Sequence, residues 1–296
     1  MKWPQKNSEV LPRAVVHVCI ENLYASIASR DRTDIRERPF VTGGEGTLVT
    51  SSNHLAAGLG IQKGMTISDA LEIYPSLEVV PTDLEGGESA SEAMFEAMRQ
   101  FSHRVEESGL HRGFADLSRS DGYSITSYET VARELAIVIQ RRIGLEVRLG
   151  LSLNRTLSAI ACNAGAAGGV TMLPRRFIPL FLRRTSVSDI PGMATNQAAR
   201  LRHVQICTAG ELFAQSASRV QQLLGRSGVD LWKELQGEQV FQISQTTADA
   251  SIFQSYTHGG DSPAGTSKKA RSGSFVFPSW LDLNLAFSRW HPGARV

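Results

Sequence analysis

The sequence is poor in cysteine and has no long apolar run. Its 296 residues contain three cysteines, Cys19, Cys162 and Cys207, which lie far apart along the chain. This odd, scattered set argues against a disulfide framework or a cysteine-rich zinc ribbon. No stretch reaches the roughly 18 apolar residues that a membrane-spanning helix needs, and the first residues lack the apolar core of a signal peptide. We therefore expect a cytoplasmic protein without a membrane partner.

The sequence also has little net charge. The formal net charge is only +2, so the total charge does not indicate a nucleic-acid-binding protein. Any contact with nucleic acid must come from local basic patches. Apolar residues make up 42% and charged residues 20% of the chain, which is ordinary for a globular protein. The length is sufficient for two or three small domains.

The hydrophobic pattern predicts alternating strands and helices. The apolar run 14–20 reads as a buried strand, and the glycine-containing segment 85–89 breaks the pattern. The other predicted elements are helices at 22–29, 92–103 and 126–143 and strands at 113–117 and 145–149. Alternation of this kind predicts an α+β fold.

A motif closes the first predicted strand. Residues 17–24 read His-Val-Cys-Ile-Glu-Asn-Leu-Tyr, which resembles the opening motif of Y-family translesion DNA polymerases. Further segments resemble motifs of the same family in the same order, at 38–41, 59–66, 70–77, 150–155, 187–192 and 223–232. Together they span about residues 14 to 240. The chain is identified as a member of this family.

The resemblance implies a division into polymerase domains. The palm, a ferredoxin-like mixed sheet with helices, would comprise 1–24 and 85–180, and small fingers would comprise 25–84. A helical thumb of helix-hairpin-helix type would occupy 181–240. Active members carry a further DNA-gripping domain, the little finger, after the thumb. We expect that domain to be missing or vestigial here, with 241–296 as a partly disordered linker and tail.

The family's metal-binding carboxylates are replaced in this sequence. The resemblance places the three ligand positions on Cys19, His111 and Arg112. Active relatives use Mg²⁺, which prefers oxygen ligands, and a thiol, an imidazole and a guanidinium do not assemble a magnesium pair. The sequence therefore predicts no catalytic residues, no metal and no cofactor, and a chain that is not an enzyme.

The family's nucleotide-binding positions also differ. The resemblance places two triphosphate contacts on His54 and Ala57, and a third on Ala159. None of these side chains supplies the hydroxyl or cation that grips a triphosphate in the family. Tyr24 keeps the aromatic ring at the position that discriminates against a ribose 2′-hydroxyl in relatives.

DNA contacts are predicted in the palm motif 150–155 and in the thumb hairpin. A hairpin followed by a helix points backbone N–H groups at a phosphate. Together with pairs of basic residues around the hairpin, this predicts weak binding of primer–template or single-stranded DNA. The predicted DNA-binding residues are Asn154, Arg155, Pro191, Gly192, Met193, Ala194 and Arg200.

The tail contains an apolar segment that resembles a clamp-binding peptide. Leu283, Leu285 and Phe287 match the spacing of the peptides by which bacterial polymerases dock on the sliding clamp, in which apolar side chains enter a preformed groove. The alternative is a terminal strand or helix that folds back on the thumb.

The resemblance implies a role in DNA damage tolerance. Loss of all three ligands resembles the ImuB class of accessory proteins, so we expect a catalytically inactive, DNA-binding adaptor that assists a translesion polymerase at the nucleoid. Two alternatives stay open: a low-efficiency polymerase whose metal site is rebuilt from Glu21 or Asp116, and a truncated remnant without function. Cys19 and His111 could instead fill the core, bind a soft metal, or, for Cys19, act as a regulatory thiol.

Overall fold

A five-stranded sheet forms the centre of the molecule. The computed structural model describes residues 10–243 except 12, 45 and 119–122. One edge strand pairs with its neighbour in parallel, and the other three pairs of neighbouring strands are antiparallel. In spatial order the strands are β10 (Val170–Met172), β9 (Arg148–Ser152), β2 (Val15–Cys19), β7 (Arg112–Asp116) and β6 (Val105–Glu107). β2 is therefore the central strand, and we call this the central sheet.

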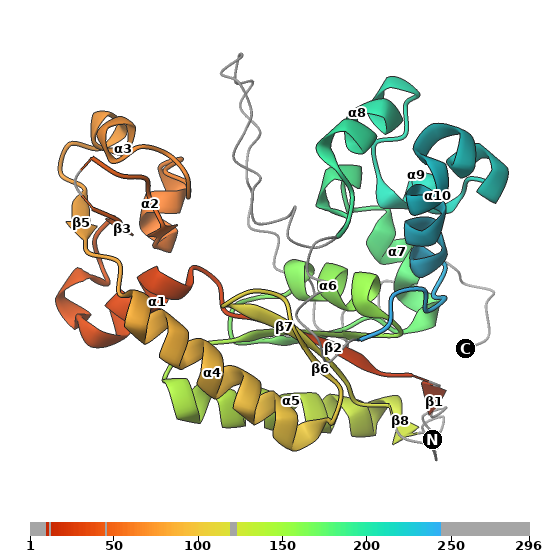
Figure 1. Ribbon diagram of the computed structural model, residues 1–296, viewed down its shortest axis with the longest axis horizontal. Helices are drawn as coiled ribbons and strands as arrows, with labels where there is room; N and C mark the ends of the chain where they lie inside the picture. Colours follow the sequence, from red (N-terminus) through yellow and green to blue (C-terminus); the bar gives the residue numbers. More distant parts are fainter. Residues whose placement is uncertain (1–9, 12, 45, 119–122, 244–296) are drawn as a thin grey trace, which may run out of the picture.

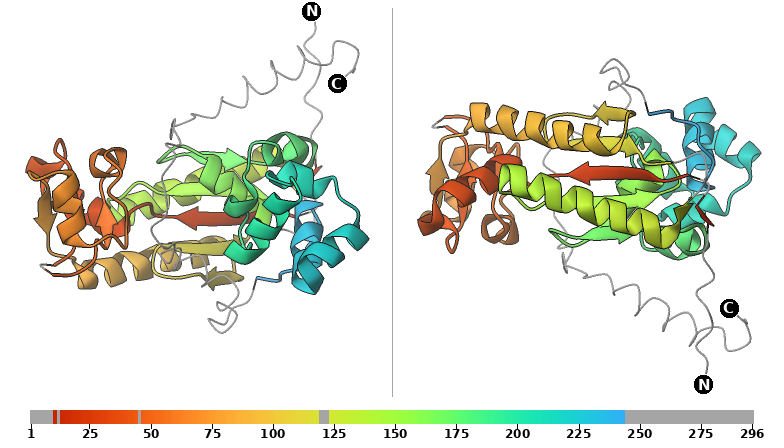
Figure 2. Two further views of the ribbon diagram at one scale, coloured as in Figure 1. Left: turned by 90° about the horizontal axis from the view of Figure 1, so that it is seen from above. Right: turned by 90° about the horizontal axis from the view of Figure 1, so that it is seen from below.

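Helices cover both faces of the central sheet. The long helices α4 (Leu84–Phe101) and α5 (Ile125–Ile143) lie on one face, and α6 (Arg155–Ala164) lies on the other (Figures 1 and 2). On β2, Val16 and Val18 belong to the main core beneath α4 and α5, whereas Val15 packs with Ala159 of α6. The strand is buried on both sides, which explains why its sequence is a continuous apolar run.

α6 approaches β9 closely at a glycine. A side chain at Gly150 would collide with the backbone of Ser158 and Cys162, so only glycine allows the helix to lie this close to the strand. The predicted strand 145–149 is instead β9, which begins at Arg148 and includes Gly150.

A small lobe, residues 33–80, extends from one end of the central sheet (Figure 1). α1 (Leu23–Asp31) leads into it from β2. Its core is separate from the main one and includes Val41, Ile61 and Ile67. Its elements are η1 (Thr33–Ile35), β3 (Phe40–Thr42), β4 (Ser51–Ser52), α2 (His54–Gly58), α3 (Ile67–Ile73) and β5 (Glu78–Val80), with the strands in the order β4-β3-β5.

A helical lobe, residues 175–235, lies at the other end of the sheet (Figure 1). Its longest helix, α10, is interrupted at Gly225, which has φ 72°. Its elements are η2 (Arg175–Phe177), α7 (Ile178–Leu182), η3 (Val187–Asp189), α8 (Thr195–His203), α9 (Ala209–Phe213) and α10 (Ala217–Leu235). A short antiparallel pair, β1 (Val10–Leu11) and β8 (Tyr123–Ser124), completes the described structure.

The helical lobe is joined to α6 by a buried polar contact. The Glu234 carboxylate accepts hydrogen bonds from the backbone N–H groups of Thr156, at 3.2 Å, and Val240, at 2.7 Å. The Asn154 side-chain amide donates to the carbonyls of Glu234 and Glu238 at 2.8 and 2.7 Å. Burial raises the pKa of Glu234. These bonds fix the lobe against the sheet.

The predicted α+β class is confirmed by this mixed architecture. The segment 85–89 was expected to break the pattern, and this was wrong, since α4 runs through it from Leu84. Asp83 caps the helix by accepting from the Gly86 N–H at 2.8 Å, and a side chain at Gly87 would strike the Tyr24 ring.

The domain boundaries stay predictions, and the predicted fate of the little finger falls on 244–296, outside the described residues. No described helix is long and apolar enough to cross a membrane.

Candidate functional site

The strand register places two arginines on either side of Cys19. Cys19, at the end of β2, lies opposite Arg112 of β7 and opposite Arg148 of β9. Residues directly opposite one another on neighbouring strands point to the same face of a sheet. Arg112, Cys19 and Arg148 therefore form a row across three strands, which we call the arginine row.

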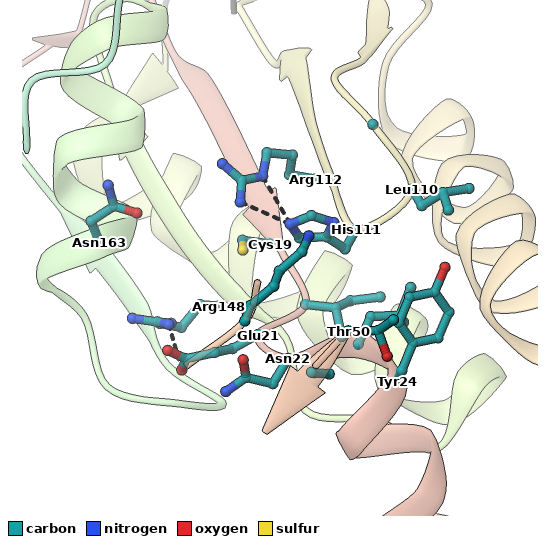
Figure 3. A pocket seen from close by; sticks show the side chains of 15 residues that line it. Cys19, Glu21, Asn22, Tyr24, Thr50, Leu110, His111, Arg112, Arg148 and Asn163 are labelled. Atoms are coloured by element: carbon teal, nitrogen blue, oxygen red, sulfur yellow. Dashed lines mark hydrogen bonds and ion pairs between the residues drawn. The ribbon is translucent and has the colours of Figure 1, made fainter. Parts of the chain in front are cut away.

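The arginine row borders a pocket of about 510 Å³ between the central sheet and the small lobe (Figure 3). The first residues of α1 form part of its wall, and so do Thr50 and Ser51 of the small lobe. We call it the fork pocket. Its chemically distinctive lining residues are Cys19, Glu21, Lys63, His111, Arg112 and Arg148.

Positive charge dominates the fork pocket. Arg148 pairs with the exposed Glu21 carboxylate at 2.5 Å and donates to the Gly165 carbonyl at 3.3 Å. Within the described part of the chain, neither Arg112 nor Lys63 has a carboxylate partner within ion-pair distance. One carboxylate thus faces three cations.

His111 and Cys19 add no negative charge to this pocket. The Arg112 guanidinium donates two hydrogen bonds to Nε2 of His111, at 2.8 and 3.2 Å. Burial, together with the Arg112 charge, lowers the pKa of His111 to about 4, so the imidazole is neutral at pH 7. Burial raises the pKa of the Cys19 thiol above its ordinary value, so the thiol stays protonated.

The residues of the fork pocket do not fit a pair of magnesium ions. Across residues 10–243 with the gaps given above, no group of three or more His, Cys, Asp or Glu side chains could hold a metal ion. The Arg112 and Arg148 guanidiniums stand beside Cys19 and would repel a divalent cation. A soft metal shared by Cys19 and His111 would meet the same charges, and Arg112 already occupies one imidazole nitrogen.

Glu21 and Asp116, the carboxylates considered for a rebuilt site, are not brought together. Asp116 lies opposite Val15 at the far end of β2 from Cys19. Four residues of extended strand span about 13 Å. Asp116 instead accepts from the Ser118 N–H at 2.9 Å and pairs with Arg104 at 3.3 Å.

A second pocket, of about 440 Å³, lies between the central sheet and the turn that precedes α8. We call it the hairpin pocket. Arg112 and Asn163 line both pockets, so the two adjoin and form one cleft from the small lobe to the helical lobe. The other lining residues include His17, Phe114, Ala159, Asp189 and Pro191.

One of the predicted DNA-binding residues, Arg155, belongs to a buried ion pair beneath the hairpin pocket. Arg155, 3% exposed, pairs with the equally buried Glu106 of β6. The Arg155 guanidinium lies 4.8 Å from the centre of the Phe114 ring, and His17 stacks on that ring at 4.5 Å. Burial, with nearby arginines, lowers the pKa of His17 to about 3.

This burial argues against the predicted role of Asn154 and Arg155 in DNA binding. Asn154 is fully buried, and its side chain caps α6 by accepting from the Leu157 N–H at 2.9 Å. Both side chains already have protein partners, so a phosphate could reach them only if the sheet and the helical lobe separated. The sign available in the sequence was the Val-Glu-Glu of β6. A glutamate buried in a strand needs a cation as its partner.

The other predicted positions are spread along the cleft. Tyr24 lines the fork pocket and Ala159 the hairpin pocket, whereas His54 and Ala57 are exposed on α2 and line neither of these two pockets. In the hairpin, Pro191 and Met193 are buried, Gly192 has φ 86°, and Ala194 and Arg200 are exposed. Leu283, Leu285 and Phe287 lie outside the described residues.

Sequence reasoning missed Arg148, Lys63 and Asn163, which all line the fork pocket. Only the pairing of β9 with β2 opposite Cys19 brings Arg148 to this place. A basic residue at the start of a predicted strand carries no such signal by itself.

Comparison with known proteins identifies the family. The model of the impB/mucB/samB family matches residues 18–163. DNA polymerase IV of Citrobacter koseri is 25% identical over 228 residues, which cover 76% of this chain and 65% of that protein. The chain belongs to the Y-family of DNA polymerases. DNA polymerase IV 1 of Bacillus subtilis is 27% identical over 230 residues, or 76% of this chain and 55% of that protein. This Y-family chain therefore spans less than two thirds of the length of either relative.

Solved Y-family structures share the fold. The crystal structure of DinB from Sulfolobus solfataricus has a TM-score of 0.67 and 20% identity, and covers 75% of this chain and 66% of that one. The insertion ternary complex of Dbh DNA polymerase has a TM-score of 0.66 and 20% identity, over 75% of this chain and 67% of that one.

The prediction that this chain is not an enzyme is wrong, because both curated relatives carry the name of a polymerase. That prediction came from three substituted positions, Cys19, His111 and Arg112. Ligand positions inferred one by one from a single sequence do not determine whether a chain is an enzyme. The predictions of the family and of the fold are confirmed.

Proposed function

We propose that this Y-family chain binds primer–template DNA in translesion synthesis and acts as an accessory factor that presents the DNA to a partner polymerase. The observation that carries the proposal is the cleft formed by the fork and hairpin pockets, which three cations, Lys63, Arg112 and Arg148, line against two carboxylates, Glu21 and Asp189. In support, one structural neighbour is described as an insertion ternary complex of a DNA polymerase. DNA damage tolerance would be the setting of this activity.

The cleft has the charge and shape to follow a DNA backbone. Arg112 stands where the two pockets meet, and Arg148 and Lys63 line its small-lobe end. Gly192 turns the chain just before α8, where backbone N–H groups can approach a phosphate. With a net charge of only +2, attraction to DNA would be concentrated in this cleft.

Fluorescence anisotropy of a labelled primer–template tests the proposal. Because Lys and Arg contacts release counterions, affinity should fall at least about tenfold when the salt concentration rises from about 50 to 200 mM. Arg112→Gln and Arg200→Gln should weaken binding. Arg133→Gln is the matched control, since Arg133 lies on α5 and pairs with Glu129 at 2.7 Å. No binding at low salt, or equal loss in the control, would refute the proposal and favour a truncated remnant.

Nucleotide incorporation is the second candidate, and the names of the relatives favour it. The fork pocket does not fit a magnesium pair, so we derive no catalytic step through one. Primer extension with Mg²⁺ and with Mn²⁺ tests this candidate. Incorporation that Glu21→Ala abolishes would support a rebuilt site. Salt-sensitive binding without incorporation would support the accessory role.

A translesion polymerase and the sliding clamp are the proposed protein partners. The clamp contact would be made by Leu283, Leu285 and Phe287. Pull-down of purified clamp should be lost in a Leu283→Ala/Phe287→Ala variant and kept in a variant with changes in the fork pocket. Equal capture by the tail variant would refute this contact.

A further inference from the structure

We infer that the fork pocket binds a phosphate group directly through Arg112 and Arg148, without a divalent metal ion. The inference rests on the proposed function only in taking DNA as one source of the phosphate. A free triphosphate is the other source. In either case the guanidinium groups would take the role that metal ions have in two-metal sites.

The strand register puts the two arginines on the same face of the central sheet. Both lie directly opposite Cys19, one on each neighbouring strand, so their Cα atoms are separated by two strand spacings, about 10 Å. Their side chains leave the same face of the sheet at the mouth of the fork pocket (Figure 3). Two arginine side chains that start from this Cα separation are long enough to grip one phosphate from two sides.

The surrounding groups leave a net positive charge in the fork pocket. Glu21 is the single carboxylate that lines the pocket among the described residues, and it pairs with Arg148 alone. His111 takes hydrogen bonds from Arg112 but is neutral, so it orients the guanidinium without cancelling its charge. Lys63 adds a further cation from the small lobe.

The first turn of α1 also favours an anion here. Asn22 and Leu23 line the fork pocket, and the Asn22 side chain makes no capping hydrogen bond. The first N–H groups of a helix have no acceptor within the helix, and the helix dipole is positive at this end. These N–H groups can donate to a phosphate that the arginine row already holds.

Magnesium should oppose binding in this pocket. A magnesium-bound polyphosphate carries less negative charge than the free anion, so its attraction to the arginine row is weaker. In a metal-mediated site the same ion would strengthen binding. The sign of the magnesium effect therefore separates the two modes of binding.

Isothermal titration calorimetry of the full chain with inorganic triphosphate provides the first test. We expect binding in the presence of EDTA and an affinity at least about fivefold lower when magnesium is in excess, at constant ionic strength. Binding that requires magnesium would overturn the inference. No binding under either condition would also overturn it.

Arginine variants locate the site. Arg112→Gln and Arg148→Gln should each lower the affinity about tenfold or more, because each removes charge-assisted hydrogen bonds. Arg112→Lys keeps the charge but loses the fork, so its loss should be smaller. Arg133→Gln should not change the affinity. Thermal unfolding of each variant checks its fold, and if Arg112→Gln does not fold, unchanged affinity in folded Arg112→Lys and Arg148→Gln would overturn the inference.

Competition with labelled DNA identifies the source of the phosphate. Displacement of DNA by triphosphate would show that backbone phosphates occupy the fork pocket, and simultaneous binding would show that it holds a free polyphosphate. DNA binding without any triphosphate binding would overturn this inference and leave the proposed function standing. Triphosphate binding without DNA binding would refute the proposed function and leave this inference standing.

Discussion

Two arginine sites on the same face of the central sheet differ in exposure and in charge pairing. In the arginine row, Arg112 has no carboxylate partner among the described residues and faces an open pocket. Under the hairpin pocket, Arg155 is 3% exposed, pairs with Glu106 and covers the Phe114 ring. The contrast shows that a basic residue is available to a ligand where it lines an open pocket, and is withdrawn where the fold buries it with a counter-charge.

The largest effect should come from removing the counter-charge of Arg155. Glu106→Ala leaves a buried guanidinium without its carboxylate, so the free energy of unfolding should fall by about 3 to 5 kcal/mol. Chemical denaturation measures this change. The matched control is Glu107→Ala, which removes a carboxylate from the surface pair with Arg99 and should cost less than about 1 kcal/mol. Similar losses in the two variants would mean that the buried pair contributes no more to stability than the surface pair.

Reversing the charge of the arginine row should change what the fork pocket binds. In a Cys19→Asp/Arg112→Glu variant the affinity for triphosphate in EDTA should fall about 100-fold, since one cation is lost and two anions are added. Calorimetry with magnesium chloride alone should detect stronger cation binding by this variant than by the natural chain. Retention of triphosphate affinity would place the anion site elsewhere.

Acid should destabilise the part of the sheet near both arginine sites. The pKa of His17 is lowered to about 3 and that of His111 to about 4, each mainly by burial, whereas an unfolded histidine titrates near 6.5. The unfolded state therefore binds more protons below about pH 6.5, and stability is lost as the pH falls toward 4. The slope is at most about 1.4 kcal/mol per pH unit for each histidine.

Thermal unfolding at a series of pH values between about 7 and 4 measures this loss. A His17→Phe variant removes one titrating group and should show a shallower dependence. An identical pH profile in that variant would show that His17 does not carry the effect.

The smallest effect should come from freeing Arg148. Glu21→Gln removes an exposed carboxylate that pairs with Arg148, so the affinity for triphosphate should rise a few-fold. Stability should change by less than about 1 kcal/mol, as is usual for surface pairs. The same calorimetric titration and a thermal unfolding curve measure both quantities. A weaker affinity would mean that Glu21 positions Arg148 for the phosphate.

Much of the fold could be predicted from the sequence. The run 14–20 gave β2, and the periodic helix 126–143 is α5 to within one residue. The start of α4 was missed because Gly86 and Gly87 look like a break, and only the Asp83 cap and the packing of Tyr24 show why they are helical. The bounds of β9 were missed for a similar reason, since Gly150 lies inside the strand where α6 packs closely against it.

The candidate site was predicted only in part. Cys19, His111, Arg112 and Tyr24 were chosen from the motif resemblance, and the structure brings all four to the fork pocket. Arg148 and Lys63 could not be chosen in that way, because their position depends on strand pairing and on how the small lobe meets the sheet. Arg155 was predicted to bind DNA, and the structure buries it.

The sequence by itself determined the family, the fold class and the residues at the end of β2, because motifs and hydrophobic periodicity are local properties of the chain. Only the tertiary structure decided which arginines line an open pocket and which are buried. Strand register sets Arg112 and Arg148 beside the neutral Cys19 and sets Arg155 against Glu106. The charge available in a site depends on these long-range pairings, and one sequence does not show them.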